Sequence, residues 1–260
     1  MKLDRVIAVR NDKTVYRDGD LSIKVFHDVY TKSDVLHEAY NHACVEDSGL
    51  NIPHLHEVTT TENGDWAIVS DYIQGKTFAQ LMQQTPERKE EFLTAFCDLH
   101  LSVLSRQAPQ MSPLQPKLKD KIMHAQLPMT TRFDLLRRLD SMPVHHKLLH
   151  GDFNPSNIIQ REDGSVVIID WSHVTQGNAT ADAVGSCLLF LMQNEQQLAL
   201  RYLRMFAEKS NTEMPYIRKW IPIVAAAWSV TMPEKKRDYL LEIADGRPLE
   251  ELSGLETGEA

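Results

Sequence analysis

The sequence lacks several features that would place it in other classes of protein. No stretch approaches the roughly 18 uncharged apolar residues of a membrane helix, and residues 1–7 lack the apolar core of a secretory signal. The three cysteines lie far apart, without the paired spacing of a zinc site. Positive charge is in deficit, with 28 Lys and Arg against 36 Asp and Glu, a net charge of −8. We therefore expect a cytoplasmic protein with reduced thiols that binds neither nucleic acid nor an anionic membrane.

The chain does have the length and apolar content of a folded enzyme. Its 260 residues, 42% of them hydrophobic, suffice for one bilobal unit or two small domains. An acidic balance is compatible with an enzyme that accepts neutral or cationic small molecules. The sequence carries no signal for the oligomeric state.

Residues 148–172 hold three oxygen-bearing side chains suited to phosphoryl transfer. Asp152 and Asn157 are close in sequence on a segment that a glycine and a proline keep from forming a regular element. The β-branched run 165–169 is typical of a buried strand, and Asp170 follows it directly. Magnesium prefers oxygen ligands and takes only one or two protein carboxylates. This favours Asn157 and Asp170 as metal ligands and Asp152 as the group that accepts a proton from an attacking hydroxyl. Turn capping is the alternative for an isolated Asp or Asn.

The segment between these groups predicts a hairpin. Ile158 and Ile159 read as a short strand, and the turn 161–164 ends in a glycine that permits positive φ. A hairpin here folds Asp170 back toward Asn157.

The runs His150–Asn157 (HGDFNPSN) and Ile169–Trp171 (IDW) resemble the catalytic and metal-binding motifs of the aminoglycoside phosphotransferase and choline kinase-like family. That family shares the protein-kinase fold. The resemblance implies an α+β bilobal protein in which a small antiparallel five-stranded sheet with one helix precedes a larger, mostly helical lobe. We place the nucleotide-binding lobe at 1–72, the hinge linker at 73–76 and the catalytic and substrate-binding lobe at 77–260.

The same resemblance assigns supporting roles. An Asp near the start of the next helix braces the catalytic loop in this family, and Asp182 fits that position. Asn154 stands where the commoner pattern has a histidine, which affects how the loop is held. His100 and His150 are expected to be structural rather than catalytic.

The first ninety residues predict the five-stranded sheet and its helix. In the run 21–26, Lys24 alternates with Leu21, Ile23 and Val25 and therefore points to the opposite face. The expected strands are 6–9, 13–16, 21–26, 55–60 and 66–72, with a helix at 33–49 capped by Ser33.

Within a kinase-like lobe, the third strand carries the lysine that pairs with nucleotide phosphates. The resemblance thus gives Lys24 this role and Glu38, on the following helix, the role of its partner. Glu46 on the same helix is the other candidate, and either glutamate could be plain helix surface.

Two further parts of a nucleotide site follow from the same likeness. The linker backbone at Asp71, Tyr72 and Ile73 is expected to receive the adenine. The phosphate-covering loop Arg10–Lys13 has no glycine. Backbone amides at its centre are still expected to approach the phosphates, and Lys13 is expected to add positive charge there.

These features predict an ATP- and Mg²⁺-dependent kinase that phosphorylates a hydroxyl of a small molecule. The alternatives are a catalytically silent nucleotide-binding scaffold, which the missing glycine loop supports, and an atypical protein kinase, which the missing Asp-Phe-Gly sequence opposes. The acceptor (aminoglycoside, choline-like amine, sugar or metabolite), any role in antibiotic resistance and the choice of ATP or GTP stay open. Residues that are candidates to contact the acceptor are Trp171, His173, Tyr202, Trp228 and Glu234. For each of them, a place in the core or on the solvated surface is an equally good interpretation.

Overall fold

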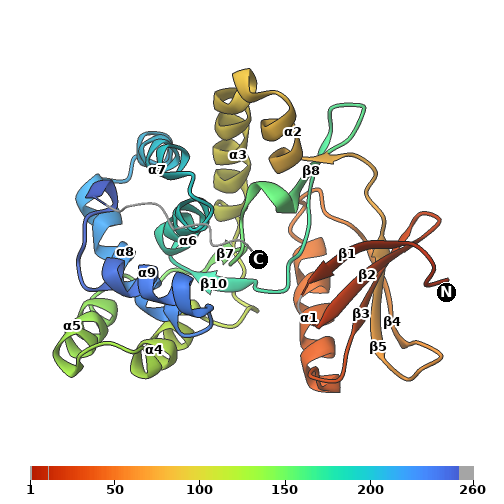
Figure 1. Ribbon diagram of the computed structural model, residues 1–260, viewed down its shortest axis with the longest axis horizontal. Helices are drawn as coiled ribbons and strands as arrows, with labels where there is room; N and C mark the ends of the chain where they lie inside the picture. The colour runs from red at the N-terminus through yellow and green to blue at the C-terminus, as the bar shows by residue number, and fades with distance from the viewer. Residues whose placement is uncertain (1, 11, 252–260) are drawn as a thin grey trace. The chain divides into compact units, whose positions relative to one another are not determined.

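The computed structural model describes residues 2–10 and 12–251, in which the chain divides into two compact units (Figure 1). The first unit is formed by the chain up to Pro86 together with Pro155–Val174. The second is formed by Glu87–Asn154 and by the chain from Thr175 onward. The chain therefore passes from one unit to the other three times.

The first unit contains a five-stranded antiparallel sheet of order β1-β2-β3-β5-β4. Side-chain alternation sends Ile23 and Val25 to one face, where they pack with Ala67 and Val69. Lys24 lies on the opposite face, as its position in the strand predicted. The strands are β1 (Val6–Arg10), β2 (Lys13–Asp18), β3 (Leu21–Phe26), β4 (Leu55–Thr60) and β5 (Trp66–Asp71).

One helix, α1 (Lys32–Glu46), lies alongside this sheet (Figure 1). Its buried residues Val35 and Ala39 pack in one cluster with Phe26 and Ile68 of the sheet. The predicted cap Ser33 is wrong. Thr31 caps the helix instead, because its hydroxyl accepts the Asp34 N–H while the Asp34 carboxylate accepts the Thr31 N–H.

The rest of the first unit is built around a three-stranded sheet of order β6-β8-β9. Strand β6 pairs with β8, and Gly75 packs so closely on the Gln160 carbonyl that a Cβ would collide with it. The chain that follows residues 73–76, as far as Pro86, therefore belongs to the first unit. The compact units thus differ from a division into contiguous lobes at 73–76. The elements are β6 (Lys76–Thr77), α2 (Phe78–Gln84), the 3-10 turn η2 (Pro155–Asn157), β8 (Ile158–Gln160) and β9 (Val166–Ile168). The 3-10 turn η1 (Pro86–Arg88) lies where the chain passes into the second unit.

The second unit is mostly helical, and α6 lies at its centre with nearly every residue buried (Figure 1). Gly185 of α6 lets the ring of Trp228 approach, since a Cβ there would lie 2.9 Å from the ring. A two-stranded ladder of β7 and β10 lies beside the helices. The elements are α3 (Lys89–Leu104), α4 (Leu114–His124), α5 (Met129–Asp140), β7 (Lys147–Leu149), β10 (Thr175–Gly177), α6 (Ala179–Leu191), α7 (Gln196–Ser210), α8 (Met214–Ser229), α9 (Glu234–Ala244) and η3 (Leu249–Glu251).

The predicted α+β, protein-kinase-like fold is confirmed: a five-stranded antiparallel sheet with one helix precedes a mostly helical part. Within residues 2–10 and 12–251, no helix combines the length and the apolar character that crossing a membrane requires.

Candidate active site

The loop His150–Asn154, which holds the predicted catalytic residue Asp152, belongs to the second unit and follows β7. Gly151 at its start has φ +81°, a conformation that glycine adopts readily. The backbone N–H of Asp152 donates to Nδ1 of the buried His150 at 3.3 Å. The side-chain amide of Asn154 donates to Oδ1 of Asp152 at 3.1 Å and to the Asp152 carbonyl at 3.0 Å. The loop therefore fixes both the backbone and the carboxylate of Asp152.

Asp182, in the first turn of α6, braces this loop as predicted. Its carboxylate accepts the backbone N–H groups of His150 at 2.8 Å and Gly151 at 2.9 Å. His100 Nε2 lies 3.2 Å from the same carboxylate, and His100 Nδ1 lies 2.7 Å from the Tyr202 hydroxyl. Burial disfavours the charged form of Asp182, but the bonds and charges of His100 and His150 hold its pKa below the usual range. Both histidines are fully buried, as expected of structural residues.

Asn157 and Asp170 lie at the same end of the β8–β9 hairpin, within the first unit. Ile158 pairs with Ile168, and beyond this pair the N–H of Ile169 donates to the Asn157 carbonyl at 2.9 Å. The predicted hairpin is thus confirmed. Asp170 has φ +63°, a left-handed conformation that is uncommon outside glycine and that clusters at functional sites.

Lys24 bridges two carboxylates in the first unit. Its Nζ lies 2.8 Å from Oε1 of Glu38 and 3.1 Å from Oδ1 of Asp170. The predicted partner Glu38 is therefore confirmed over Glu46, whose carboxylate accepts the N–H of Leu55. The bridge joins β3, α1 and the end of the β8–β9 hairpin through one ammonium group.

The charges of this bridge stabilise one another. Burial opposes the charged form of Lys24, but the Asp170 and Glu38 carboxylates outweigh it and raise the Lys24 pKa above its usual value. Burial likewise opposes the charged form of Glu38, yet Lys24 and Lys13 keep the Glu38 pKa below its usual range. Lys24 and Glu38 therefore both carry their charges near neutral pH.

Lys13 takes part in a contact that the sequence reasoning missed. Its Nζ lies 2.8 Å from Oε2 of Glu38, the carboxylate that also binds Lys24. The register of the ladder explains the contact, because Val15 stands opposite Lys24 and Lys13 lies two residues earlier, on the same face. The expectation that Lys13 adds charge beside phosphates stays a prediction, and Asn11, in the same loop, lies outside the described residues.

The three predicted hinge residues Asp71, Tyr72 and Ile73 differ in what their backbone N–H groups bind. The N–H of Asp71 donates to the His54 carbonyl at 3.0 Å, and the N–H of Tyr72 donates to the Asp20 carbonyl at 2.8 Å. No bond from the N–H of Ile73 occurs among residues 2–10 and 12–251. Of the three predicted hinge residues, Ile73 is thus the one whose N–H is not used by the described part of the chain.

Two of the candidate acceptor contacts are wrong. Trp171 is 1% exposed and donates its indole N–H to the Ile168 carbonyl at 3.1 Å, so it is a core residue. Tyr202 is fully buried against His100. Large aromatic side chains reach hydrogen-bond partners inside a core as readily as at a site, and the sequence does not distinguish the two.

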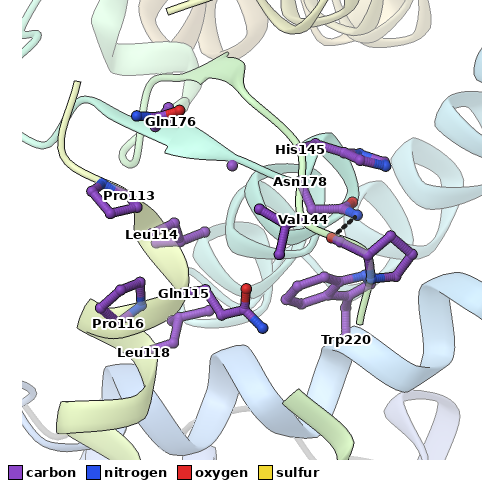
Figure 2. Close-up of a pocket in the computed structure, with 12 residues that line it drawn as sticks. Pro113, Leu114, Gln115, Pro116, Leu118, Val144, His145, Gln176, Asn178 and Trp220 are labelled. Carbon is purple, nitrogen blue, oxygen red and sulfur yellow. Dashed lines mark hydrogen bonds between the residues drawn. The ribbon is translucent and has the colours of Figure 1, made fainter. Parts of the chain in front are cut away.

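A pocket of about 190 Å³ lies in the second unit between α4, the start of α8 and the segments that flank β7 and β10 (Figure 2). No Asp, Glu, Lys or Arg lines it. The side-chain amides in its wall are used within the protein: Gln115 donates to the Leu139 carbonyl at 2.8 Å, and Asn178 donates to the Tyr216 hydroxyl at 2.7 Å. Among the described residues that line the pocket, His145 is the ionisable side chain.

Comparison with known proteins agrees with this geometry. The model of the phosphotransferase enzyme family matches residues 5–220. The chain belongs to this family. The resemblance that the motifs of the catalytic loop and of Asp170 indicated is thereby confirmed. No curated protein matches the sequence of this phosphotransferase.

Solved structures share the fold of the phosphotransferase at low identity. A ternary complex of a thermostable mutant of aminoglycoside phosphotransferase APH(4)-Ia with ADP and hygromycin B is 13% identical, with a TM-score of 0.63 over 93% of this chain and 86% of that chain. The GDP complex of wild-type aminoglycoside 2'-phosphotransferase-IIIa is 13% identical, with a TM-score of 0.61 over 93% and 90%. Choline kinase LicA from Streptococcus pneumoniae is 15% identical, with a TM-score of 0.60 over 94% and 93%. At these identities the likeness establishes the fold.

Proposed function

We propose that this phosphotransferase is a kinase that uses ATP and Mg²⁺ to phosphorylate a hydroxyl group of a small molecule. The observation that carries the proposal is the bridge from Lys24 to Glu38 and Asp170, on the hairpin end that also holds Asn157. A buried-strand lysine clamped between two carboxylates is the arrangement that protein-kinase-like enzymes use to hold nucleotide phosphates.

The first unit supplies the nucleotide contacts. Lys24 has a raised pKa and therefore keeps its positive charge for the phosphate oxygens. The N–H of Ile73 is the donor that the linker offers to a ring nitrogen of the base. A cytoplasmic location, where thiols stay reduced, fits the three free cysteines of the described chain.

The side chains of Asn157 and Asp170 fit a magnesium ion. Both offer hard oxygen donors, and magnesium takes few protein ligands because phosphate oxygens and water complete its shell. The left-handed backbone of Asp170 turns this residue out of the strand direction at the hairpin end. When bound, the ion neutralises phosphate charge that develops during transfer.

Asp152 is the residue we assign to the acceptor. Asn154 and His150 fix it in one orientation. Asp152 and Asn157 are five positions apart in the sequence, a span of at most about 18 Å when the chain is fully extended. In the reaction the acceptor oxygen bonds to the γ-phosphorus while the bond to the β,γ-bridging oxygen breaks, and the Asp152 carboxylate takes the hydroxyl proton.

The solved neighbours support a small-molecule acceptor. One of them was crystallised with hygromycin B, and another is a choline kinase. These acceptors differ in size and charge but share a hydroxyl group. We therefore propose a hydroxyl as the reacting group, and a substrate screen would identify the molecule that bears it.

Two substitutions test the proposal in an ATP-consumption screen over hydroxyl-bearing metabolites and aminoglycosides. Asp152→Asn should lower kcat about 1,000-fold on the substrate found, while MgATP still binds, because the variant loses only the proton acceptor. Asp170→Asn should lose Mg²⁺-dependent ATP binding. Wild-type turnover by Asp152→Asn would refute the assignment, and ATP binding without turnover of any acceptor would instead support a silent nucleotide-binding scaffold.

A further inference from the structure

Two lysines from neighbouring strands share one carboxylate in the first unit. Lys13 of β2 lies 2.8 Å from Oε2 of Glu38, and Lys24 of β3 lies 2.8 Å from Oε1. The side chain of Glu38 is 12% exposed, so these contacts form away from bulk water. Both oxygens of the glutamate therefore have a cationic partner.

The sheet register explains how Lys13 reaches this position. Lys13 stands directly opposite Phe26, as Val15 stands opposite Lys24, and all four side chains share the face that carries α1. The ammonium lies 4.8 Å from the centre of the Phe26 ring and 4.7 Å from that of Tyr30. Two aromatic faces and one carboxylate thus hold the ammonium of Lys13, which is 20% exposed.

We propose that Lys13 is a positioning residue that holds Glu38, so that Glu38 in turn keeps Lys24 directed at the nucleotide phosphates. The expected effect on nucleotide binding rests on the proposed function, whereas the contact between Lys13 and Glu38 does not depend on it. It assigns Lys13 a place inside the sheet–helix contact rather than a place against the phosphates.

Charge counting shows why a second lysine matters. Lys13, Lys24, Glu38 and Asp170 together carry no net charge, whereas without Lys13 the remaining three carry one negative charge. The single ammonium of Lys24 would then be shared by two carboxylates, with no second cation to hold Glu38. A carboxylate bound on one side only is also less restrained in rotation, so Lys24 is held less firmly.

The direct test is Lys13→Met, which keeps the length and apolar stem of the side chain but removes its charge. We expect the Kd for MgATP, measured without acceptor, to rise about tenfold, equivalent to about 1.4 kcal/mol. The KM for ATP should rise in parallel, with kcat reduced less than threefold. Lys13→Arg should restore most of the affinity. The matched control is Lys32→Met, which removes a lysine that lies 5.3 Å from the Trp66 ring in the same unit, and it should leave the Kd unchanged.

A double-mutant cycle separates positioning from direct phosphate contact. If Lys13 acts through Glu38, Lys13→Met should cost little further affinity in a Glu38→Gln background. Full additivity of the two losses would overturn the proposal in favour of a direct contact with phosphate.

A nucleotide-free measurement keeps the test independent of the proposed function. Glu38 faces Lys13 and Lys24, and Asp170 lies beyond Lys24. In a carboxyl-carbon NMR titration, the Glu38 pKa should rise in Lys13→Met and stay at the wild-type value in Lys32→Met. An unchanged Glu38 pKa in Lys13→Met would refute the contact. If the wild type bound no nucleotide, the proposed function would fail, and this titration alone would decide whether Lys13 holds Glu38.

Discussion

At the scale of single residues, Asn154 shows how the catalytic loop works without the histidine that the commoner motif carries at this position. Its one amide group donates both to the Asp152 carboxylate and to the Asp152 carbonyl. A side chain that is 8% exposed and bonded twice to its neighbour has little freedom to move. The orientation of Asp152 therefore depends on a neutral donor, which leaves the carboxylate as the local negative charge.

Asn154→Ala should lower kcat about tenfold while the KM for ATP stays unchanged, because only the orientation of the Asp152 carboxylate is lost. Asn154→His should recover most of the rate, since an imidazole N–H can replace one of the two donated bonds. Steady-state kinetics on the identified acceptor check both variants, with a thermal melt to confirm that each is folded. A rise in the KM for ATP with kcat unchanged would contradict this account.

The sequence predicted Lys24 and its partner Glu38 but missed the contact of Lys13 with Glu38. Alternation in the strand put Lys24 on the face opposite Ile23 and Val25, and family likeness supplied Glu38. The second lysine was visible only through the register of β2 on β3, which a strand pattern does not specify without its partner. Lys13 thus needed the ladder, whereas Lys24 did not.

At the scale of elements, the catalytic loop is held by the first turn of α6. One buried carboxylate, Asp182, accepts two backbone N–H groups of the loop and a contact from His100. The first turn of a helix also favours negative charge, because its backbone N–H groups point toward it. Helix and loop are therefore one cooperative piece.

Asp182→Asn should reduce the free energy of unfolding by about 2–4 kcal/mol at pH 7, since it leaves buried donors without a charged acceptor. The folded-state pKa of Asp182 is lowered, so its contribution is complete above the unfolded pKa of about 3.9 and is lost as pH falls through the folded pKa. The difference between wild type and variant should therefore shrink below about pH 4. Urea unfolding from pH 7 to pH 3 measures it, with the exposed Asp134→Asn of α5 as the control. A difference that stays constant with pH would argue against the charge of Asp182 as the cause.

Element prediction succeeded where the pattern was long enough. The strands of the five-stranded sheet and the β8–β9 hairpin follow from alternation and turn residues. The ladder of β7 and β10 was missed, because these strands lie far apart in the sequence and no turn joins them, whereas the turn 161–164 signalled the equally short β8 and β9. Thr31 and Ser33 are equally good caps by type, and only the reciprocal bond with Asp34 distinguishes them.

At the scale of the whole molecule, the residues assigned to nucleotide and metal and the residue assigned to the acceptor belong to different compact units. Lys24, Glu38, Asn157 and Asp170 belong to the first, whereas Asp152 belongs to the second. The chain leaves the second unit at Asn154, only two residues after Asp152. Nucleotide binding and acceptor activation should therefore be separable by mutation, because they depend on different folded units.

Hydrogen exchange with and without MgATP tests this separation. At a nucleotide concentration 100 times the Kd, binding stabilises the state that binds by about 2.7 kcal/mol, which should slow exchange in peptides of α1 and β9. Asp152→Asn should show the same protection as the wild type, because its substitution lies in the other unit. Asp170→Asn should show none, because it removes the carboxylate that pairs with Lys24 and is assigned to the metal. Loss of protection in Asp152→Asn would mean that the catalytic loop takes part in holding the nucleotide, and the division of labour between the two units would have to be abandoned.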